Sequence, residues 1–353
     1  MELQLAATRK EKPKDQSKLG FGQYFTDHMF IMNYEAGKGW INPRIVPYGP
    51  LCLDPSAMCL HYGQEVFEGL KAYLSPEGKV LLFRPDENFK RLNRSNERMV
   101  IPQFDEEFVL KALMELINIE KEWIPTAPGT SLYIRPYIIA SEPHLGVHPA
   151  KEYMFIIILS PVGAYYASGL NPVNIYVEPN YVRAVRGGVG WAKTGGNYAA
   201  SLKGQEEAEG QKYSQVLWLD GIERKYIEEV GAMNIFFFIG DELVTPELSG
   251  SILPGITRMS VLEIAKSWGI RAVERRITIE EITAAYDKGE LKEAFGSGTA
   301  AVISPVGHLK YNDKIMVLND GKIGALSQRL YDTLTGIQWG RIEDPFGWSV
   351  EVK

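Results

Sequence analysis

The sequence predicts a mixed α/β (α+β) protein with two α/β domains joined by an interdomain loop. The chain has 353 residues, which is more than one hydrophobic core usually serves. Short apolar runs of strand length alternate with amphipathic stretches of helix length. A turn-rich segment, 161–172, separates two such series. We therefore expect a mobile N-terminal arm over 1–20, a smaller domain over 21–160, and a larger domain over 173–353.

The first domain begins its regular pattern with the apolar run 79–83, which predicts a strand. Residues 87–99 have helical periodicity, and so do residues 106–123, where Pro125 stops the helix. The continuous apolar runs that follow predict two buried strands, at 133–140 and 154–159.

The second domain repeats this alternation of strands and helices, which supports a second α/β unit. Strands are expected at 173–177, 215–219, 233–239, 243–244 and 271–276. Helices are expected to begin near Asn197, Arg258, Ile279 and Gly324. The sequence has neither an internal repeat nor a low-complexity segment, so repeat architectures are excluded.

The composition excludes several classes of function. The net charge is −6, with acidic and basic residues interspersed, so the chain lacks the basic stripe of a nucleic-acid-binding protein. Its longest apolar runs are strand-sized, and we expect no membrane segment. The polar first twenty residues have no signal-peptide core, and Cys52 and Cys59 are the only cysteines. A soluble protein of the reducing cytoplasm is expected.

His144 and His148 have the spacing of a metal-binding pair on a helix. Pro143, Gly146 and Pro149 prevent a helix there, and no carboxylate lies between the two histidines. We therefore expect no metal site.

The most informative segment is 187–197, GGVGWAKTGGN, in which five glycines surround Lys193. A lysine in such a rigid setting serves as an imine-forming amine or as a charge on phosphate, although most loop lysines are simply exposed. A nucleotide-binding P-loop is the main alternative, but Ala192 stands where that motif has glycine. Arg183 and Arg186 also precede the segment in place of an apolar strand.

Three further elements gain meaning if Lys193 binds an aldehyde cofactor. Thr257 stands where an N-cap belongs before a helix over 258–268, so backbone N–H groups there could hold a phosphate. The small-residue turn 296–300 offers further amides. Glu228 and Glu229 enter the strand 233–239, and alternation directs one inward, where it could protonate a ring nitrogen. Each element alone is also compatible with a purely structural role.

Ordered motifs over nearly the whole chain supply the context, and the sequence closely resembles the branched-chain amino acid aminotransferases, pyridoxal phosphate enzymes of fold type IV. The motifs are 25–29 (FTDHM), 67–71 (FEGLK), 84–85 (RP), 133–136 (YIRP), 188–198 (GVGWAKTGGNY), 215–220 (QVLWLD), 229–234 (EVGAMN), 253–258 (LPGITR) and 295–300 (FGSGTA). The resemblance implies reversible transamination of L-leucine, L-isoleucine and L-valine with 2-oxoglutarate. It also implies pyridoxal 5'-phosphate as cofactor and a homodimer.

The resemblance also assigns roles to individual residues. Lys193 would be the catalytic Schiff-base lysine, Glu229 would contact the pyridine nitrogen, and Tyr198 would contact the phenolic oxygen. The phosphate would be held by Arg84, Ile256, Thr257 and Thr299. Substrate contacts would come from Tyr62, Phe67, Tyr133, Arg135, Thr299 and Ala300, from Tyr165 in the interdomain loop, and from Leu145 and Val147 across a dimer interface.

Two other activities of the same fold, D-amino acid aminotransferase and aminodeoxychorismate lyase, share the lysine and the carboxylate. The strings 195–198 (GGNY) and 229–234 (EVGAMN) favour the branched-chain enzymes. The expected partners are small amino acids, 2-oxo acids and a second copy of the chain, with no nucleic acid and no membrane.

Overall fold

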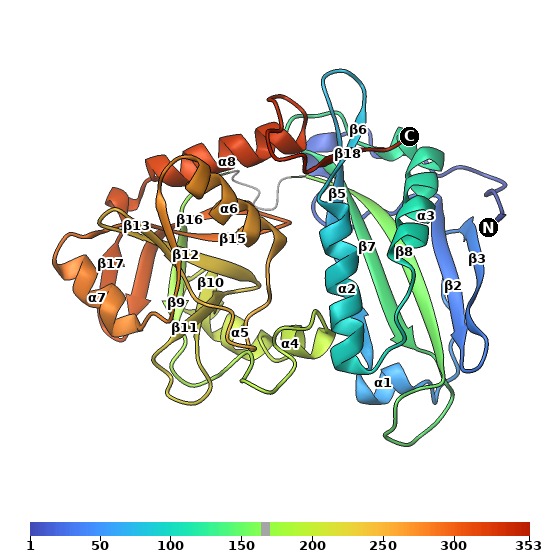
Figure 1. The fold of residues 1–353 in the computed structure, drawn as a ribbon, viewed down its shortest axis with the longest axis horizontal. Helices are drawn as coiled ribbons and strands as arrows, with labels where there is room; N and C mark the ends of the chain where they lie inside the picture. The colour runs from blue at the N-terminus through green and yellow to red at the C-terminus, as the bar shows by residue number, and fades with distance from the viewer. Residues whose placement is uncertain (164–169) are drawn as a thin grey trace. The chain divides into compact units, whose positions relative to one another are not determined.

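The computed structural model describes residues 1–163 and 170–353 (Figure 1). Contacts group the chain into two compact units, each of which is described by itself. Unit 1 starts at Met1 and includes Ala192–Gly195 and Gly336–Lys353. Unit 2 consists of residues 170–191 and of Gly196–Thr335. The expected domain over 173–353 therefore needs correction, because the segment with Lys193 and the C-terminal residues belong to unit 1.

Unit 1 is built on a single sheet with the strand order β1-β3-β2-β8-β7-β5-β6-β18, and β4 pairs with β7. Its strands are β1 (Glu2–Leu3), β2 (His28–Glu35), β3 (Gly39–Pro47), β4 (Glu65–Phe67), β5 (Leu70–Leu74), β6 (Val80–Phe83), β7 (Ser131–Ala140), β8 (Glu152–Val162) and β18 (Ser349–Glu351). Most neighbours are antiparallel, and β1 joins β3 in parallel. Segments near the two ends of the sequence thus form the opposite edges of one sheet.

Two helices, α2 (Pro85–Met99) and α3 (Glu106–Ile119), pack against one face of this sheet (Figure 1). The Asp105 side chain caps α3 by accepting from the Phe108 N–H at 3.0 Å. Apolar residues recur along α3 at helical spacing and enter the core with strand residues. They are Val109, Ala112, Leu113, Leu116 and Ile117. The helix expected to reach residue 123 ends at Ile119, and a short 3₁₀ turn, Lys121–Trp123, follows it.

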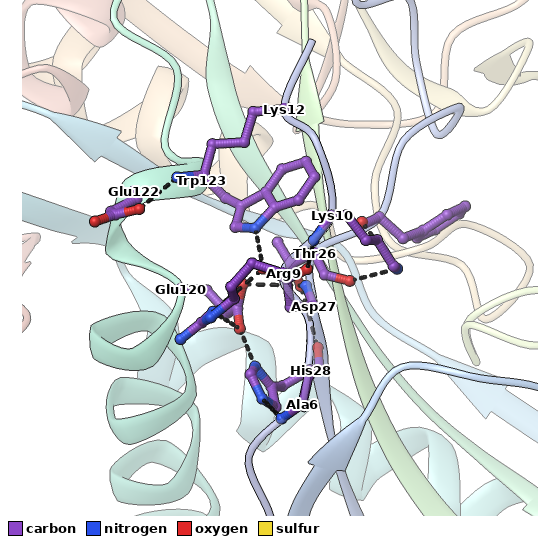
Figure 2. Close-up of polar contacts among 11 residues, drawn as sticks. Ala6, Arg9, Lys10, Lys12, Thr26, Asp27, His28, Glu120, Glu122 and Trp123 are labelled. Atoms are coloured by element: carbon purple, nitrogen blue, oxygen red, sulfur yellow. Dashed lines mark hydrogen bonds and ion pairs between the residues drawn. The ribbon is translucent and has the colours of Figure 1, made fainter.

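The first residues of the chain are attached to unit 1, which corrects the expectation of a mobile arm (Figure 2). β1 forms the edge of the sheet, and the Arg9 guanidinium lies 3.2 Å from carboxylate oxygens of both Asp27 and Glu120. Glu120 also bonds the ring of His28, and both side chains are fully buried. Buried carboxylates require cationic or N–H partners. The arm supplies some of these partners and is held in place by them.

Unit 2 contains a sheet that closes on itself. Its strand order is β11-β10-β9-β16-β15-β12-β13-β14, and β11 also pairs with β12, so six strands form a closed barrel. The strands are β9 (Val173–Val177), β10 (Gln215–Leu219), β11 (Ile227–Val230), β12 (Met233–Ile239), β13 (Glu242–Thr245), β14 (Arg271–Glu274), β15 (Leu291–Gly298), β16 (Val302–Tyr311) and β17 (Lys314–Val317), which pairs with β16. Closure leaves the six barrel strands without an unpaired edge.

In the sequence, the helices of unit 2 stand between its strands or after them (Figure 1). They are α4 (Gly195–Ala199), α5 (Leu202–Gly210), α6 (Ile256–Ser267), α7 (Ile279–Asp287) and α8 (Ala325–Gln338). Ala208 of α5 packs on Val216 and Trp218 of β10. No helix in residues 1–163 or 170–353 is long and apolar enough to cross a membrane.

Candidate active site

The main chain of Lys193 is hydrogen-bonded on both sides by residues of unit 1. Its N–H donates to the hydroxyl of Ser95 at 2.9 Å, and its carbonyl accepts from the N–H of Phe67 at 2.9 Å. Ser95 lies on α2 and Phe67 is the last residue of β4, so a helix and a strand both hold the main chain of Lys193. The backbone that carries the lysine amine is therefore fixed within this unit.

Glu65, at the start of β4, holds the residues that follow the lysine. Its carboxylate accepts from the N–H of Gly195, and its carbonyl accepts from the Thr194 hydroxyl at 2.7 Å. Burial raises the pKa of the Glu65 carboxyl, although the bonds from Gly195 and Thr194 oppose this rise. A side chain at position 195 would overlap the carboxylate, so the approach requires glycine there.

The ring of Phe67 brings four of the expected residues together. The Lys193 amine lies 4.7 Å from the centre of this ring, and the Arg135 guanidinium lies 4.8 Å from it. Arg135 also donates to the hydroxyl of Tyr133 at 3.0 Å, since both residues lie on the same face of β7. An amine, an aromatic ring and a guanidinium thus meet in unit 1.

A buried charge beside Phe67 was not predicted. The Glu68 carboxylate is fully buried and forms an ion pair with Arg91, with N–O distances of 2.7 and 2.9 Å. Burial alone would raise the pKa of Glu68, but the attraction of Arg91 and then of Lys193 lowers it. Lys71 is a buried amine, and burial lowers its pKa to about 8.

Arg84, expected to contact phosphate, has an unusual backbone. It precedes α2 with φ 49° and ψ 45°, in the left-handed region that non-glycine residues seldom adopt. Its N–H donates to the carbonyl of Trp348 at 2.8 Å, and its guanidinium lies 4.9 Å from the centre of that indole ring. Strained backbone of this kind is often found at functional sites.

The remaining expected residues of unit 1 that the structure describes are exposed. Tyr62 is 40% exposed at the end of α1 (Met58–Tyr62). Leu145 and Val147 are 67% and 85% exposed in the loop that joins β7 to β8. Tyr165 lies outside the described residues.

In unit 2, Glu228 and Glu229 are neighbours on β11, and both are buried. Glu229 forms an ion pair with Arg183, and its carboxylate accepts from the side chain of Asn234 at 3.3 Å. Glu228 accepts instead from the hydroxyl of Ser251. The two carboxylates have different partners, as alternation along a strand requires, and neither is solvated, because β11 is buried along its whole length.

Arg183 is a site residue that sequence reasoning missed. In the sequence, Arg183 served only as an argument against the apolar strand that a P-loop needs before the lysine segment. Its side chain is buried, and burial lowers the pKa of the guanidinium, against the attraction of Tyr198 and Glu228. Tyr198, expected at the cofactor, thus lies in the same electrostatic environment as the Arg183–Glu229 pair.

The start of α6 corrects the role expected for Thr257. The helix begins at Ile256, so Thr257 is its second residue, and Gly255 takes the N-cap position without any side-chain cap. No side chain at the N-cap therefore accepts from the first N–H groups of this helix. Helix N-termini of this kind can bind an anion. A side chain at Gly255 would overlap the Asn234 amide, which donates to Glu229 and to the Leu253 carbonyl.

The small-residue turn expected over 296–300 is shorter than predicted. β15 continues through Gly298, and Thr299 and Ala300 begin the connection to β16. Both residues are partly exposed. Gly296 lies within β15, where the side chains of Met233 and Val230 leave little space for a Cβ atom.

Comparison with known proteins agrees with this arrangement. The family "Amino-transferase class IV" matches residues 65–309. A curated relative, the branched-chain-amino-acid transaminase 1 of Bacillus subtilis (strain 168), is 62% identical over 97% of this chain and 96% of its own length.

Two solved structures are also similar to the chain. The branched-chain amino acid aminotransferase of "Eschelichia coli" has a TM-score of 0.77 and 28% identity, covering 93% of this chain and 99% of its own. The T.th. branched-chain amino acid aminotransferase, complexed with N-(5'-phosphopyridoxyl)-L-glutamate, has a TM-score of 0.73 and 27% identity. The match covers 91% of this chain and 98% of that one.

The fold and the family match define a class IV aminotransferase of fold type IV, and the protein is therefore an enzyme. Within this class, the chain belongs to the branched-chain amino acid aminotransferase family. The nucleotide-binding alternative is wrong. Residues 181–186 form no strand before the lysine segment, whereas a P-loop requires one.

We predict that Gly195→Ala lowers kcat/KM for transamination about ten-fold or more. The added methyl group would displace the Glu65 carboxylate and the backbone beside Lys193, and such overpacking costs about 1 to 3 kcal/mol. Gly196→Ala is the matched control, because a Cβ atom there meets nothing within 4 Å. Steady-state kinetics of both variants test this, and equal activities would contradict the proposed crowding.

Proposed function

We propose that this enzyme transfers the amino group of L-leucine, L-isoleucine or L-valine to 2-oxoglutarate, reversibly, with pyridoxal 5'-phosphate as its cofactor. The observation that carries the proposal is the Lys193 amine against Phe67, with Arg135 on the same ring. An amine for chemistry, an aromatic wall for an aliphatic side chain and a cation for a carboxylate are what these substrates require.

The residues present fit the cofactor. The α6 start has no side-chain cap and suits a phosphate, and the buried Glu229 suits a protonated ring nitrogen. We infer that Arg84, Ile256, Thr257 and Thr299 hold the phosphate. When bound, pyridoxal phosphate supplies an aldehyde that accepts an amine and a ring that takes up electrons. A similar enzyme, the T.th. aminotransferase, is complexed with N-(5'-phosphopyridoxyl)-L-glutamate.

The chain's own groups would then handle the protons and charges. The Lys193 amine would take the α-proton of the amino acid and deliver it to the carbon of the cofactor that carries the nitrogen. Glu229 would hold a negative charge against the ring nitrogen, and its ion pair with Arg183 and its hydrogen bond from Asn234 fix its orientation. Tyr198 would donate to the phenolic oxygen. Fully buried Glu68 contributes a negative charge that attracts Lys193.

Substrate recognition would be divided between apolar and cationic groups. Phe67 and Tyr133 would contact the aliphatic side chain, and Arg135 would bind the γ-carboxylate of glutamate. Further contacts would come from Tyr62, Tyr165, Thr299 and Ala300.

We also propose that two copies of the chain form a homodimer. Leu145 and Val147 are strongly exposed apolar side chains. In the dimer they would contact the substrate bound by the partner subunit. The free, partly accessible Cys52 and Cys59 agree with a reducing cytoplasm.

Lys193→Ala and Lys193→Arg should both abolish transamination, because neither methyl nor guanidinium replaces the amine. Both variants should also change the visible absorption of the bound cofactor. Lys203→Ala, which removes an exposed lysine of α5, serves as control. Near wild-type turnover in either Lys193 variant would refute the assignment.

Glu229→Gln should retain the cofactor but lower kcat about 100-fold or more, because a neutral amide cannot stabilise a protonated ring nitrogen. Glu228→Gln is the matched control on the same strand. The Glu228 carboxylate is also buried, but it accepts from the hydroxyl of Ser251 in place of the Asn234 amide. Cofactor content and kcat test both variants. A larger loss in Glu228→Gln would mean that the two faces of β11 are assigned wrongly.

Leucine, isoleucine and valine should have kcat/KM values within about 100-fold of one another, since hydrophobic fit discriminates by only about 1 to 3 kcal/mol per methylene. Alanine should be slower. Aspartate should be poor, because its carboxylate is too short to reach Arg135 and would remain among aromatic rings. Steady-state kinetics with 2-oxoglutarate test this. If aspartate or a D-amino acid is the best donor, the branched-chain specificity is wrong.

A further inference from the structure

We propose that Glu142, His144 and His148 form a binding site for one divalent transition-metal ion of the Zn²⁺ type. The three residues lie in the loop of unit 1 between β7 and β8, outside the cluster around Lys193. Their ligand atoms all lie within 4.8 Å of one another. Leu145 and Val147, which have a proposed role at a partner subunit's substrate, lie in the same loop but are not among the three ligands.

The two histidines meet although no helix carries them. A metal site was not expected from the sequence because a helical pair needs a helix and a carboxylate between its members. Here the loop folds back, so the His144 and His148 rings lie 4.7 Å apart between centres. The carboxylate comes from Glu142, which precedes both histidines. Two imidazoles and one carboxylate form a common ligand set for Zn²⁺ with an open position.

Hydrogen bonds orient the ligand atoms of His148 and Glu142 toward each other. The Nδ1 of His148 lies 2.9 Å from the Pro149 carbonyl, which can only accept, so this nitrogen carries the hydrogen. The lone pair of neutral His148 is then on Nε2, which lies 3.9 Å from Glu142 Oε1. The other oxygen, Oε2, accepts from the Lys151 N–H at 2.6 Å. Bonds of this kind fix ligand orientation in metal sites.

His144 has the freedom to complete the set. Its ring is exposed and folds over Gly146, where a Cβ atom would lie only 2.6 Å from Nε2. Tetrahedral Zn²⁺ with bonds of about 2.0 to 2.1 Å needs ligand atoms roughly 3.3 Å apart. Rotation of this exposed ring brings its nitrogen from the observed spacing into that range, whereas a buried ring could not adjust.

The ends of the loop are held by neighbouring backbone, so the site has a firm base. The Met58 N–H donates to the Glu142 carbonyl at 3.0 Å, and the His144 N–H donates to the Ser56 carbonyl at 3.1 Å. The Ala150 N–H donates to the Gln64 side chain at 3.2 Å. Because the ligands start from anchored backbone, ordering them on a metal ion costs less conformational entropy.

The test is a calorimetric titration of the purified, cofactor-bound enzyme, freed of metal with a chelator, with ZnCl₂ in a non-coordinating buffer. One Zn²⁺ per chain is expected. His144→Ala, His148→Ala and Glu142→Gln should each weaken binding about 100-fold or more, because each removes one of only three ligands. Gly146→Ala should also weaken it, since the methyl group displaces the His144 ring while all three ligands remain.

His61→Ala is the matched control. His61 is an exposed histidine on nearby α1, outside the cluster, and its loss should leave Zn²⁺ binding unchanged. Circular dichroism checks that each variant is folded, and visible absorption of the Co²⁺-loaded enzyme reports nitrogen ligation independently. Absence of Zn²⁺ binding to the wild type, or binding that survives loss of any one of the three ligands, would overturn the proposal.

Discussion

The position of the lysine amine depends on main-chain hydrogen bonds that Lys193 makes within unit 1. Its N–H and its carbonyl are both engaged, by Ser95 and by Phe67, while the residues on either side of Ala192–Gly195 belong to unit 2. A lysine side chain is long and flexible, so its amine can be placed only if its Cα atom is fixed. Glu65 adds a third constraint through Gly195, which explains why this position has no side chain.

The buried carboxylates of Glu68, Glu229 and Glu228 are stabilised in two different ways. Glu68 and Glu229 each form an ion pair with an arginine, Arg91 and Arg183, and a buried charge of this kind needs its partner. Glu228 accepts from the hydroxyl of Ser251, and burial raises the pKa of its carboxyl against the attraction of Arg183 and Arg186. Two adjacent glutamates on one strand therefore have different polar partners.

Much of the fold could be predicted, because regular elements with strong periodicity depend mainly on local sequence. β9, β10 and β12 have the expected bounds, and α7 begins at Ile279 as expected. The strands that were missed include β2, β3, β11, β15 and β16. Their sequences mix glycine, proline or charged residues with apolar ones, and their pairing is decided by partners far along the chain.

The candidate site was predictable to the extent that its chemistry depends on residue types in a pattern. Phe67, Tyr133, Arg135 and Lys193 do meet. Arg183 and Glu68 were missed because a buried charge is recognised only through its partner, which sequence alone does not supply. The available signals were the place of Glu68 within the FEGLK motif and that of Arg183 shortly before the lysine segment. The metal cluster was missed for a related reason, since a loop can bring together side chains whose spacing fits no regular element.

The strand order of unit 1 has a consequence for how the chain folds as it is synthesised. The two outer strands of this sheet are β1 and β18, which are residues 2–3 and 349–351. The barrel strands of unit 2 all lie between Val173 and Tyr311, so that unit has its full set of strands earlier. The sheet that holds the Lys193 backbone is completed only after β18 has left the ribosome, and before that point an enzyme with an intact barrel is still unfinished.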